Sequence, residues 1–280
     1  MRTPTLTTTP SSMANTPPPS SLAPQHYGAT LRRWQEQVDA RIATAARERE
    51  ARRATFTGEC RACLDTGPCP HCPRGQAVRA TQERERRIAR GAAALRAGGI
   101  TGRCQAFTLN SYPDQGHPAL RQLRAYLDTF DGTRGLILTG PYGTGKTGLL
   151  VGALRSLAEG AEGTEGEAIG FRYHTGPDLF DWLRAGYDMH DYAERLERVR
   201  RARLLAIDDL GAEKPTEKVQ EQVFSIVNHR YEQGLPTWLT TNCGLAALAA
   251  RIGERSVWRL AETCTVITVG GQNLRVRGAG

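Results

Sequence analysis

The residues with the clearest chemical meaning lie in one glycine-rich segment, Gly140-Pro-Tyr-Gly-Thr-Gly-Lys-Thr147. Glycines at this spacing let the backbone wrap closely around phosphate groups, with its N–H groups turned inward. Lys146 can reach the outer phosphates, and the hydroxyl of Thr147 can bind Mg²⁺. The segment therefore predicts a loop that binds ATP with magnesium, through Gly140, Pro141, Tyr142, Gly143, Thr144, Gly145, Lys146, Thr147 and Gly148.

Acidic and amide residues that could act on the bound phosphates follow further along the chain. Leu204-Leu-Ala-Ile-Asp-Asp209 is an apolar run that ends in two carboxylates. A buried strand would deliver them to the sheet edge where ligands bind in α/β folds. Asp208 is expected to hold Mg²⁺, and Asp209 to polarise the attacking water. Asn242 ends the run Thr237–Thr241, and its amide is expected to orient water or sense the γ-phosphate.

Four cysteines form a second group with its own chemistry. Cys60, Cys63, Cys69 and Cys72 make two C-x-x-C pairs that can offer four thiolates to one tetrahedral Zn²⁺. The surrounding segment is too short to fold on apolar burial, so the metal would supply folding free energy. His71 could replace one cysteine as a ligand, and an iron–sulfur cluster or redox thiols are the alternatives to zinc.

The nucleotide residues need a scaffold of alternating strands and helices. Such alternation predicts an α/β fold with a parallel sheet between helices. The expected strands are 135–139, 168–173, 204–208, 237–241 and 264–269. The expected helices are 146–158, 177–185 and 216–233, with 245–262 mainly helical.

Three regions are expected along the chain. Residues 1–25 are rich in Thr, Pro and Ser and are expected to be disordered. Residues 26–98 should form a small N-terminal module in which helices over about 30–53 and 76–97 flank the cysteines. Gly98-Gly99 would end that module, and residues 99–280 would form the ATPase domain.

Composition narrows the choice of partners and of compartment. The 280-residue chain has a formal net charge of +8, which suits either a polyanionic partner or simply an arginine-rich surface. Tyr187 and Tyr192, with Phe180 and Trp182, could stack on single-stranded bases or pack in a core. The sequence has no apolar run long enough to span a membrane and no apolar signal region, so a cytoplasmic protein is expected.

Taken together, the motifs resemble the DnaC/IstB branch of AAA+ ATPases over roughly residues 99–277. The resemblance rests on the glycine loop, Thr175-Gly-Pro-Asp-Leu179, Leu204–Glu213, Leu239-Thr-Thr-Asn242 and Gly253-Glu-Arg-Ser-Val-Trp-Arg259. It implies that Arg259 is an arginine finger that reaches the γ-phosphate of a neighbouring subunit, with Arg255 as the second candidate. It also implies that Arg275, or the nearby Arg277, is a second nucleotide sensor.

Within that branch, the cysteine-bearing N-terminal module is similar to that of helicase loaders. The resemblance implies an ATPase that self-associates through its ATP site and places a replicative hexameric DNA helicase on single-stranded DNA. ATP binding would favour assembly, and hydrolysis would favour release. The alternatives are an IstB-like helper of a DNA transposase and a non-hydrolysing adaptor that binds zinc and DNA. A small-molecule kinase is disfavoured because the sequence shows no acceptor site.

Overall fold

The computed structural model describes residues 40–41, 43–48, 50–51, 60, 69–160 and 170–274. The chain divides into two compact units, Met1–Arg79 and Ala80–Gly280, which are described separately. In the first unit the described residues between 40 and 51 are helical, and the helix α2 (Pro73–Ala97) begins after the cysteines and continues into the second unit. The expected boundary at Gly98-Gly99 stays a prediction.

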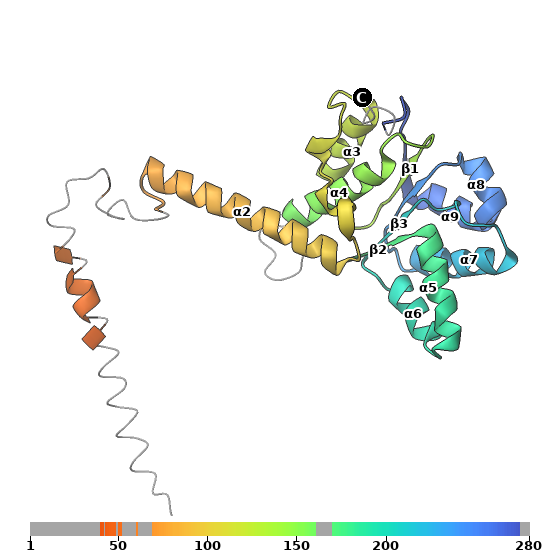
Figure 1. Ribbon diagram of the computed structural model, residues 1–280, viewed down its shortest axis with the longest axis horizontal. Coiled ribbons are helices and arrows are strands. Elements are labelled where there is room, and N and C mark those ends of the chain that lie inside the picture. The colour runs from red at the N-terminus through yellow and green to blue at the C-terminus, as the bar shows by residue number, and fades with distance from the viewer. Residues whose placement is uncertain are drawn as a thin grey trace, which may run out of the picture. The chain divides into compact units, whose positions relative to one another are not determined.

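The second unit is built on a five-stranded sheet with the order β2-β3-β4-β1-β5. Figure 1 labels three of these strands, β1, β2 and β3, among the helices of this unit. The strands are β1 (Gly135–Thr139), β2 (Phe171–Thr175), β3 (Leu204–Asp208), β4 (Thr237–Thr241) and β5 (Cys264–Thr268). Every neighbouring pair is parallel. The predicted α/β fold with a parallel sheet is confirmed, and β1, β3 and β4 have the predicted bounds.

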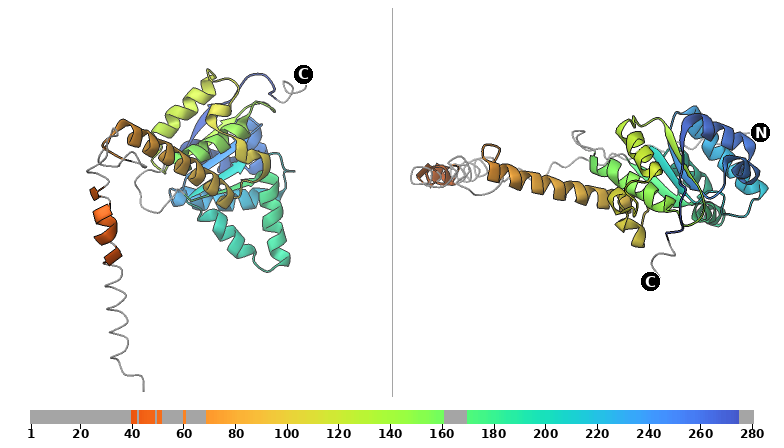
Figure 2. Two further views of the ribbon diagram at one scale, coloured as in Figure 1. Left: turned by 60° about the vertical axis from the view of Figure 1, so that its left-hand side comes forward. Right: turned by 90° about the horizontal axis from the view of Figure 1, so that it is seen from above.

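Alternating side chains bury both faces of the sheet. Leu136 and Leu138 point into one core with α3 (Pro118–Asp128) and α4 (Lys146–Gly160), whereas Ile137 points into the other. All three side chains are fully buried. The second core contains α5 (Gly176–Asp188), α6 (Tyr192–Arg200), α7 (Glu217–Glu232), α8 (Leu245–Ile252) and α9 (Glu254–Thr263). Figure 2 shows the sheet between these layers.

The structure differs from the sequence expectations most clearly in the second strand, in the segment 245–262 and in several elements that were not predicted. β2 begins three residues later than expected, where Phe171 and Tyr173 turn into the core. The expected helix 245–262 is two helices, because Gly253 has φ +90° between them, a conformation that glycine adopts without strain. The helices α3 and α6 were not predicted, nor were the 3₁₀ turns Gly102–Ala106 and Leu109–Ser111.

No helix in the described part of the chain is both long enough and apolar enough to cross a membrane.

Candidate nucleotide-binding site

The glycine loop joins the end of β1 to the first residue of α4. Gly140, Gly143 and Gly145 have φ values of +150°, +80° and +86°. A side chain at Gly140 would collide with the backbone of Val269, so the tight wrap of this loop requires glycine there. The N-terminus of α4 adds partial positive charge at the mouth of the loop, which favours an anion.

Lys146 lies buried inside the loop that it serves. Its Nζ donates hydrogen bonds to the carbonyl oxygens of Gly140 at 2.8 Å and Pro141 at 2.7 Å. It also donates to Oδ1 of Asn242 at 2.6 Å. The amine is therefore held at the place where the loop would bind phosphate, with partners that phosphate oxygens can replace.

Asp208 gathers hydroxyl groups from three elements at the end of β3. Its carboxylate accepts hydrogen bonds from Thr147 Oγ1 at 2.9 and 3.1 Å, Thr240 Oγ1 at 2.6 Å and the Tyr173 hydroxyl at 3.0 Å. Burial, and then the charge of Asp208, raise the pKa of Tyr173, so its phenol remains a donor. Thr147 and Asp208, the two predicted magnesium ligands, thus lie in contact and offer the hard oxygen atoms that Mg²⁺ prefers.

Asn242 connects the lysine to the second carboxylate. Its Nδ2 donates to Oδ1 of Asp209, while its Oδ1 accepts from Lys146. Asp209 has φ +57°, and its backbone N–H donates to Thr240 Oγ1 at 2.8 Å. The structure therefore brings together Lys146, Asp209 and Asn242, which the sequence had placed on three separate segments.

Three further residues shape this site and were not predicted as site residues. Tyr173 and Thr240 bind Asp208, and Glu213 accepts two hydrogen bonds at 3.1 Å from the backbone N–H of Gly211. Burial raises the pKa of Glu213, and the charge of Asp209 acts in the same direction. Thr240 and Glu213 were visible inside quoted motifs, but Tyr173 could be found only from the β2–β3 register, in which Thr175 pairs with Asp208.

The two candidate arginine fingers lie on α9 in different surroundings. Arg255 is exposed. Arg259 is half-buried, and its guanidinium carbon lies 5.1 Å from the ring centre of Phe224 and 5.6 Å from that of Tyr231. Its side chain also donates to the carbonyl oxygen of Arg255 at 3.2 Å. Arg275 and Arg277 lie outside the described residues.

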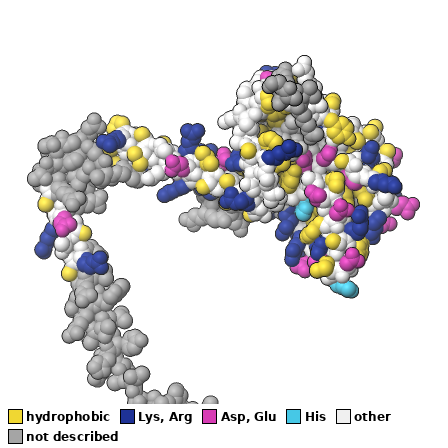
Figure 3. Space-filling view, viewed as in Figure 1, with side chains coloured by type: hydrophobic (Ala, Val, Ile, Leu, Met, Phe, Trp, Pro, Cys, Tyr) yellow, Lys and Arg dark blue, Asp and Glu magenta, His cyan; other side chains and the backbone are white. Residues whose placement is uncertain are grey.

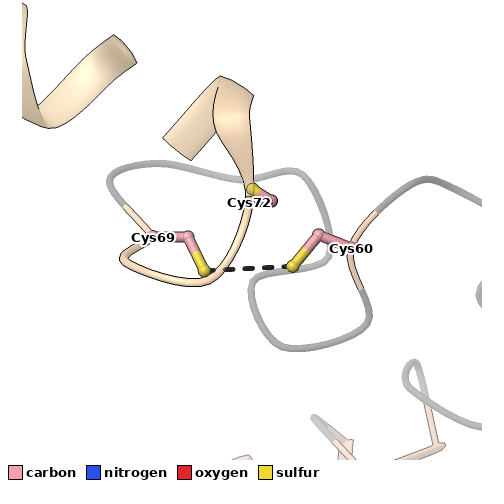
Figure 4. A group of neighbouring side chains, drawn as sticks. All are labelled: Cys60, Cys69 and Cys72. Atoms are coloured by element: carbon pink, nitrogen blue, oxygen red, sulfur yellow. Dashed lines mark hydrogen bonds between the residues drawn. The ribbon is translucent and has the colours of Figure 1, made fainter. Parts of the chain in front are cut away.

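The cysteine cluster in the first unit has the geometry of a metal site (Figure 4). The sulfur atoms of Cys60, Cys69 and Cys72 lie within 4.8 Å of one another, and all three residues are buried. The Cys60–Cys69 distance of 3.9 Å is close to the spacing of about 3.8 Å between two thiolates on one tetrahedral zinc. Backbone N–H groups of His71 and Gly75 donate to the sulfur atoms of Cys69 and Cys72.

This donor set fits a soft tetrahedral metal ion such as zinc. Cys63, the predicted fourth ligand, lies outside the described residues. The side chain of His71, the alternative ligand, is exposed and is not part of the sulfur group.

The residues considered for nucleic-acid contact divide into core and surface. Phe180 is buried, and Trp182 is stacked on His174 under the guanidinium of Arg195. Tyr187 and Tyr192 stack on each other with ring centres 4.2 Å apart, and Tyr187 remains 44% exposed.

The arginines of α6 pair with local carboxylates. Arg195 pairs with Asp191, Arg198 with Glu194, and both Arg200 and Arg201 with Glu197. Basic and acidic side chains are interspersed over the face drawn in Figure 3. These pairs offset the positive charge of this segment locally, as on a solvated helix face.

Comparison with known proteins agrees with this geometry. The model of the family "IstB-like ATP binding protein" matches residues 77–279. The replicative helicase loader DnaI of Bacillus subtilis (strain 168) is 31% identical over 121 residues. That match covers 43% of this chain and only 36% of the relative, so the chain spans about a third of that protein.

Solved structures show the same fold. A crystal structure of the DnaC helicase loader is 26% identical with a TM-score of 0.53, over 60% of this chain and 99% of that chain. A crystal structure of DnaI is 24% identical with a TM-score of 0.52, over 63% and 95% of the two chains. The chain belongs to the family of IstB-like ATP binding proteins, and its second unit is an AAA+ domain of the DnaC/IstB branch.

Proposed function

We propose that the protein is an ATP-dependent loader of a replicative DNA helicase onto single-stranded DNA. The observation that carries the proposal is the likeness of its AAA+ domain to nearly the whole of a solved DnaC helicase loader. The hydrogen-bonded group of Lys146, Asn242 and Asp209 supports the proposal that the protein hydrolyses ATP.

ATP binding exchanges contacts inside the glycine loop. The triphosphate takes the loop N–H groups, and Lys146 turns from the carbonyl oxygens of Gly140 and Pro141 to the outer phosphates. Thr147 and Asp208 would hold Mg²⁺, which would supply positive charge that offsets the charge on the phosphates. The Thr240 and Tyr173 hydroxyls keep the Asp208 carboxylate in place.

Asp209 then polarises the water that attacks the γ-phosphate. In the structure Asn242 bridges Lys146 and Asp209. When Lys146 moves onto phosphate, Oδ1 of Asn242 loses the hydrogen bond from the lysine, so the Asn242 side chain can turn. The position of Asp209 is thereby coupled to the presence of the nucleotide.

An arginine of α9 from a second copy completes the site. The helix α9 ends at Thr263, directly before the first residue of β5, so it runs toward the sheet edge opposite the nucleotide. Its ten residues span about 15 Å, close to the length of a five-residue strand. Arg255 therefore lies nearest to the nucleotide edge, whereas the family motif indicates Arg259. In both cases ATP favours self-association, and hydrolysis favours release.

The surface at the junction of α5 and α6 is proposed to contact single-stranded DNA. Lys218 lies 5.2 Å from the ring centre of Tyr187, so a cation accompanies the exposed aromatic pair. A base stacked on Tyr187 would gain about 1–3 kcal/mol. Tyr187→Ala should weaken oligonucleotide binding about tenfold, and Tyr187→Phe should keep it, as measured by fluorescence anisotropy.

The cysteine cluster is proposed to hold a structural zinc ion with Cys63. Four sulfur ligands leave no open position for catalysis. The zinc module is then the part that recognises the helicase, while the AAA+ domain times the release.

A pull-down tests the proposed function. Full-length Asp209→Asn protein with ATP and magnesium should retain a hexameric replicative helicase, and Lys146→Ala protein should not. Recovery of a transposase in place of the helicase would support the transposase helper. Absence of ATP hydrolysis by the wild-type chain would support the non-hydrolysing adaptor.

A further inference from the structure

The most exposed large apolar side chain among the described residues is Trp258, which is 73% exposed on α9. Single exposed apolar residues are common on protein surfaces and by themselves need no explanation. Trp258 differs from them in its position, because it lies between the two candidate finger arginines. Residues three and four apart share a helix face, so Arg255, Trp258 and Arg259 point to the same side of α9.

The opposite side of α9 is buried in its own domain. Val257 and Leu260 pack into the core beneath the sheet, and Ser256 is also buried. The helix is thus fixed. Arg255 and Trp258 are exposed on its outer side, whereas Arg259 lies at the border of that side, packed on Phe224 and Tyr231.

We propose that Trp258 is the aromatic anchor of ATP-dependent self-association, and that it packs against Tyr142 of the next copy. The inference rests on the proposed function, because it takes the α9 arginines to act on the nucleotide of a second copy. Tyr142 belongs to the glycine loop itself and is 67% exposed. An arginine that reaches the γ-phosphate brings Trp258, whose Cβ is about 5–6 Å from that of Arg255, to the rim of the same loop.

Charge favours a second copy at one point of this face, the finger arginine. The face carries Arg255 and Arg259 beside the carboxylates of Glu254 and Glu262, so its formal charges balance. A guanidinium of this face is complementary to the triphosphate at the nucleotide edge, and a desolvated tryptophan is a frequent source of interface affinity. The two surfaces belong to different parts of the domain, so the contact is head-to-tail and can repeat along a ring or spiral.

Sedimentation velocity of the full-length Asp209→Asn chain with ATP and magnesium tests the inference. In this background Trp258→Ala should raise the concentration needed for assembly about 30-fold. Met189→Ala removes a side chain that is 68% exposed away from α9, and it should leave assembly unchanged. Thermal unfolding, and binding of a fluorescent ATP analogue below the assembly concentration, should be the same for the Trp258→Ala variant and its parent.

A double-mutant cycle tests the partner residue. Tyr142→Ala removes part of the phosphate loop, so its ATP affinity is measured first and assembly is compared at equal saturation. If the rings touch, the two single effects on the assembly concentration should not multiply. The double variant should then assemble at a concentration at least about threefold lower than the product of the two effects predicts. Independent effects would overturn the pairing with Tyr142.

The remaining outcomes separate the inference from the proposed function. Normal ATP-dependent assembly of the Trp258→Ala variant would overturn the inference and leave the proposed function standing. Failure of the Asp209→Asn parent to assemble while saturated with ATP would overturn both the proposed self-association and the anchor.

Discussion

The nucleotide site and the cysteine cluster are organised in opposite ways. The side chains of the nucleotide site stand at the ends of strands whose inner residues, such as Leu138 and Leu239, are fully buried. In the described part of the first unit, the buried apolar cluster consists of Cys60, Cys69 and Cys72. Buried apolar side chains therefore position the nucleotide site. In the cysteine cluster, the buried side chains are the same ones that would bind the metal.

This difference determines what each ligand contributes. ATP binds a domain that is already folded, so it adds only the mass-action stabilisation of a ligand that binds the native state. A metal ion at the cysteines would supply folding free energy to a segment whose described residues have little core of their own. Four experiments can break or sharpen this contrast.

Zinc removal should have the largest effect. Apparent binding free energies of structural zinc sites are about 10–16 kcal/mol at neutral pH, and the cysteine segment should lose this amount. A chelator, or Cys69→Ser, should abolish zinc binding and make residues 60–79 sensitive to protease. ATP binding and the thermal unfolding of the AAA+ domain should change little.

Cys243→Ser is the matched control, because Cys243 is a free cysteine outside the cluster. It should keep one zinc per chain, measured by metal analysis. A chain that is purified without zinc and is equally protease-resistant with and without chelator would break the contrast.

The arginines of α9 should have the next largest effect. Removal of an arginine finger slows phosphoryl transfer by roughly 10³–10⁵-fold, so Ala substitution of the finger should reduce steady-state phosphate release to that degree. Arg259→Ala should also lower the melting temperature, because Arg259 stacks on Phe224 and Tyr231 in its own copy. Arg255→Ala should not, because Arg255 is exposed.

An experiment that mixes two inactive variants tests whether the finger comes from a second copy. Lys146→Ala protein supplies an intact arginine face, and the finger variant supplies an intact glycine loop. The mixture should regain ATPase activity that neither variant shows alone. Absence of rescue at concentrations that support assembly would argue that the arginine acts within its own copy.

Asp209→Asn should have a smaller effect on the same reaction. Loss of a general base reduces turnover by about 10²–10⁴-fold, while the Asn side chain keeps the size of the carboxylate. ATP binding and the melting temperature should be retained, since the site is positioned by the sheet. Asp181→Asn, at an exposed position of α5, is the control and should keep full activity. Undiminished phosphate release by Asp209→Asn would remove Asp209 from the mechanism.

The sequence predicts the elements of the nucleotide site better than their contacts. β1, β3 and β4 could be predicted to the residue because each is a short apolar run bounded by turn or polar residues. The site residues of the glycine loop and of β3 could also be predicted, because their motifs follow one another in order along the chain. The break at Gly253 was missed because a glycine within a helical pattern is compatible with either outcome.

Contacts between strands depend on register, which the sequence does not show. Tyr173 binds Asp208 because β2 and β3 are paired with Thr175 beside Asp208. The sequence placed the start of β2 three residues early, and strand bounds do not show which residue pairs with Asp208. A one-residue slip in that register would turn Tyr173 to the other face of the sheet. The cysteine spacing, in contrast, predicts the grouping of Cys60, Cys69 and Cys72 directly, because the three lie close together along the chain.

A pH series on Glu213 should give the smallest effect and sharpen the contrast within the nucleotide site. Burial raises the pKa of Glu213 above its unfolded value, with the charge of Asp209 adding to it. The protonated form is therefore favoured in the folded state. Its stabilisation is fully present below the unfolded pKa, near about 4.3, and is lost as pH rises through the folded pKa.

Glu213→Gln should remove this dependence. The variant should gain stability relative to the wild type as pH rises from 4 to 8, by a few degrees of melting temperature at most. Its amide oxygen can still accept from the Gly211 N–H. The exposed Glu85→Gln variant should show no such trend, measured by calorimetry over the same pH range. A relative loss of stability at high pH would mean that the Gly211 N–H bonds to the carboxylate outweigh the cost of its burial, and that the site gains from this charge.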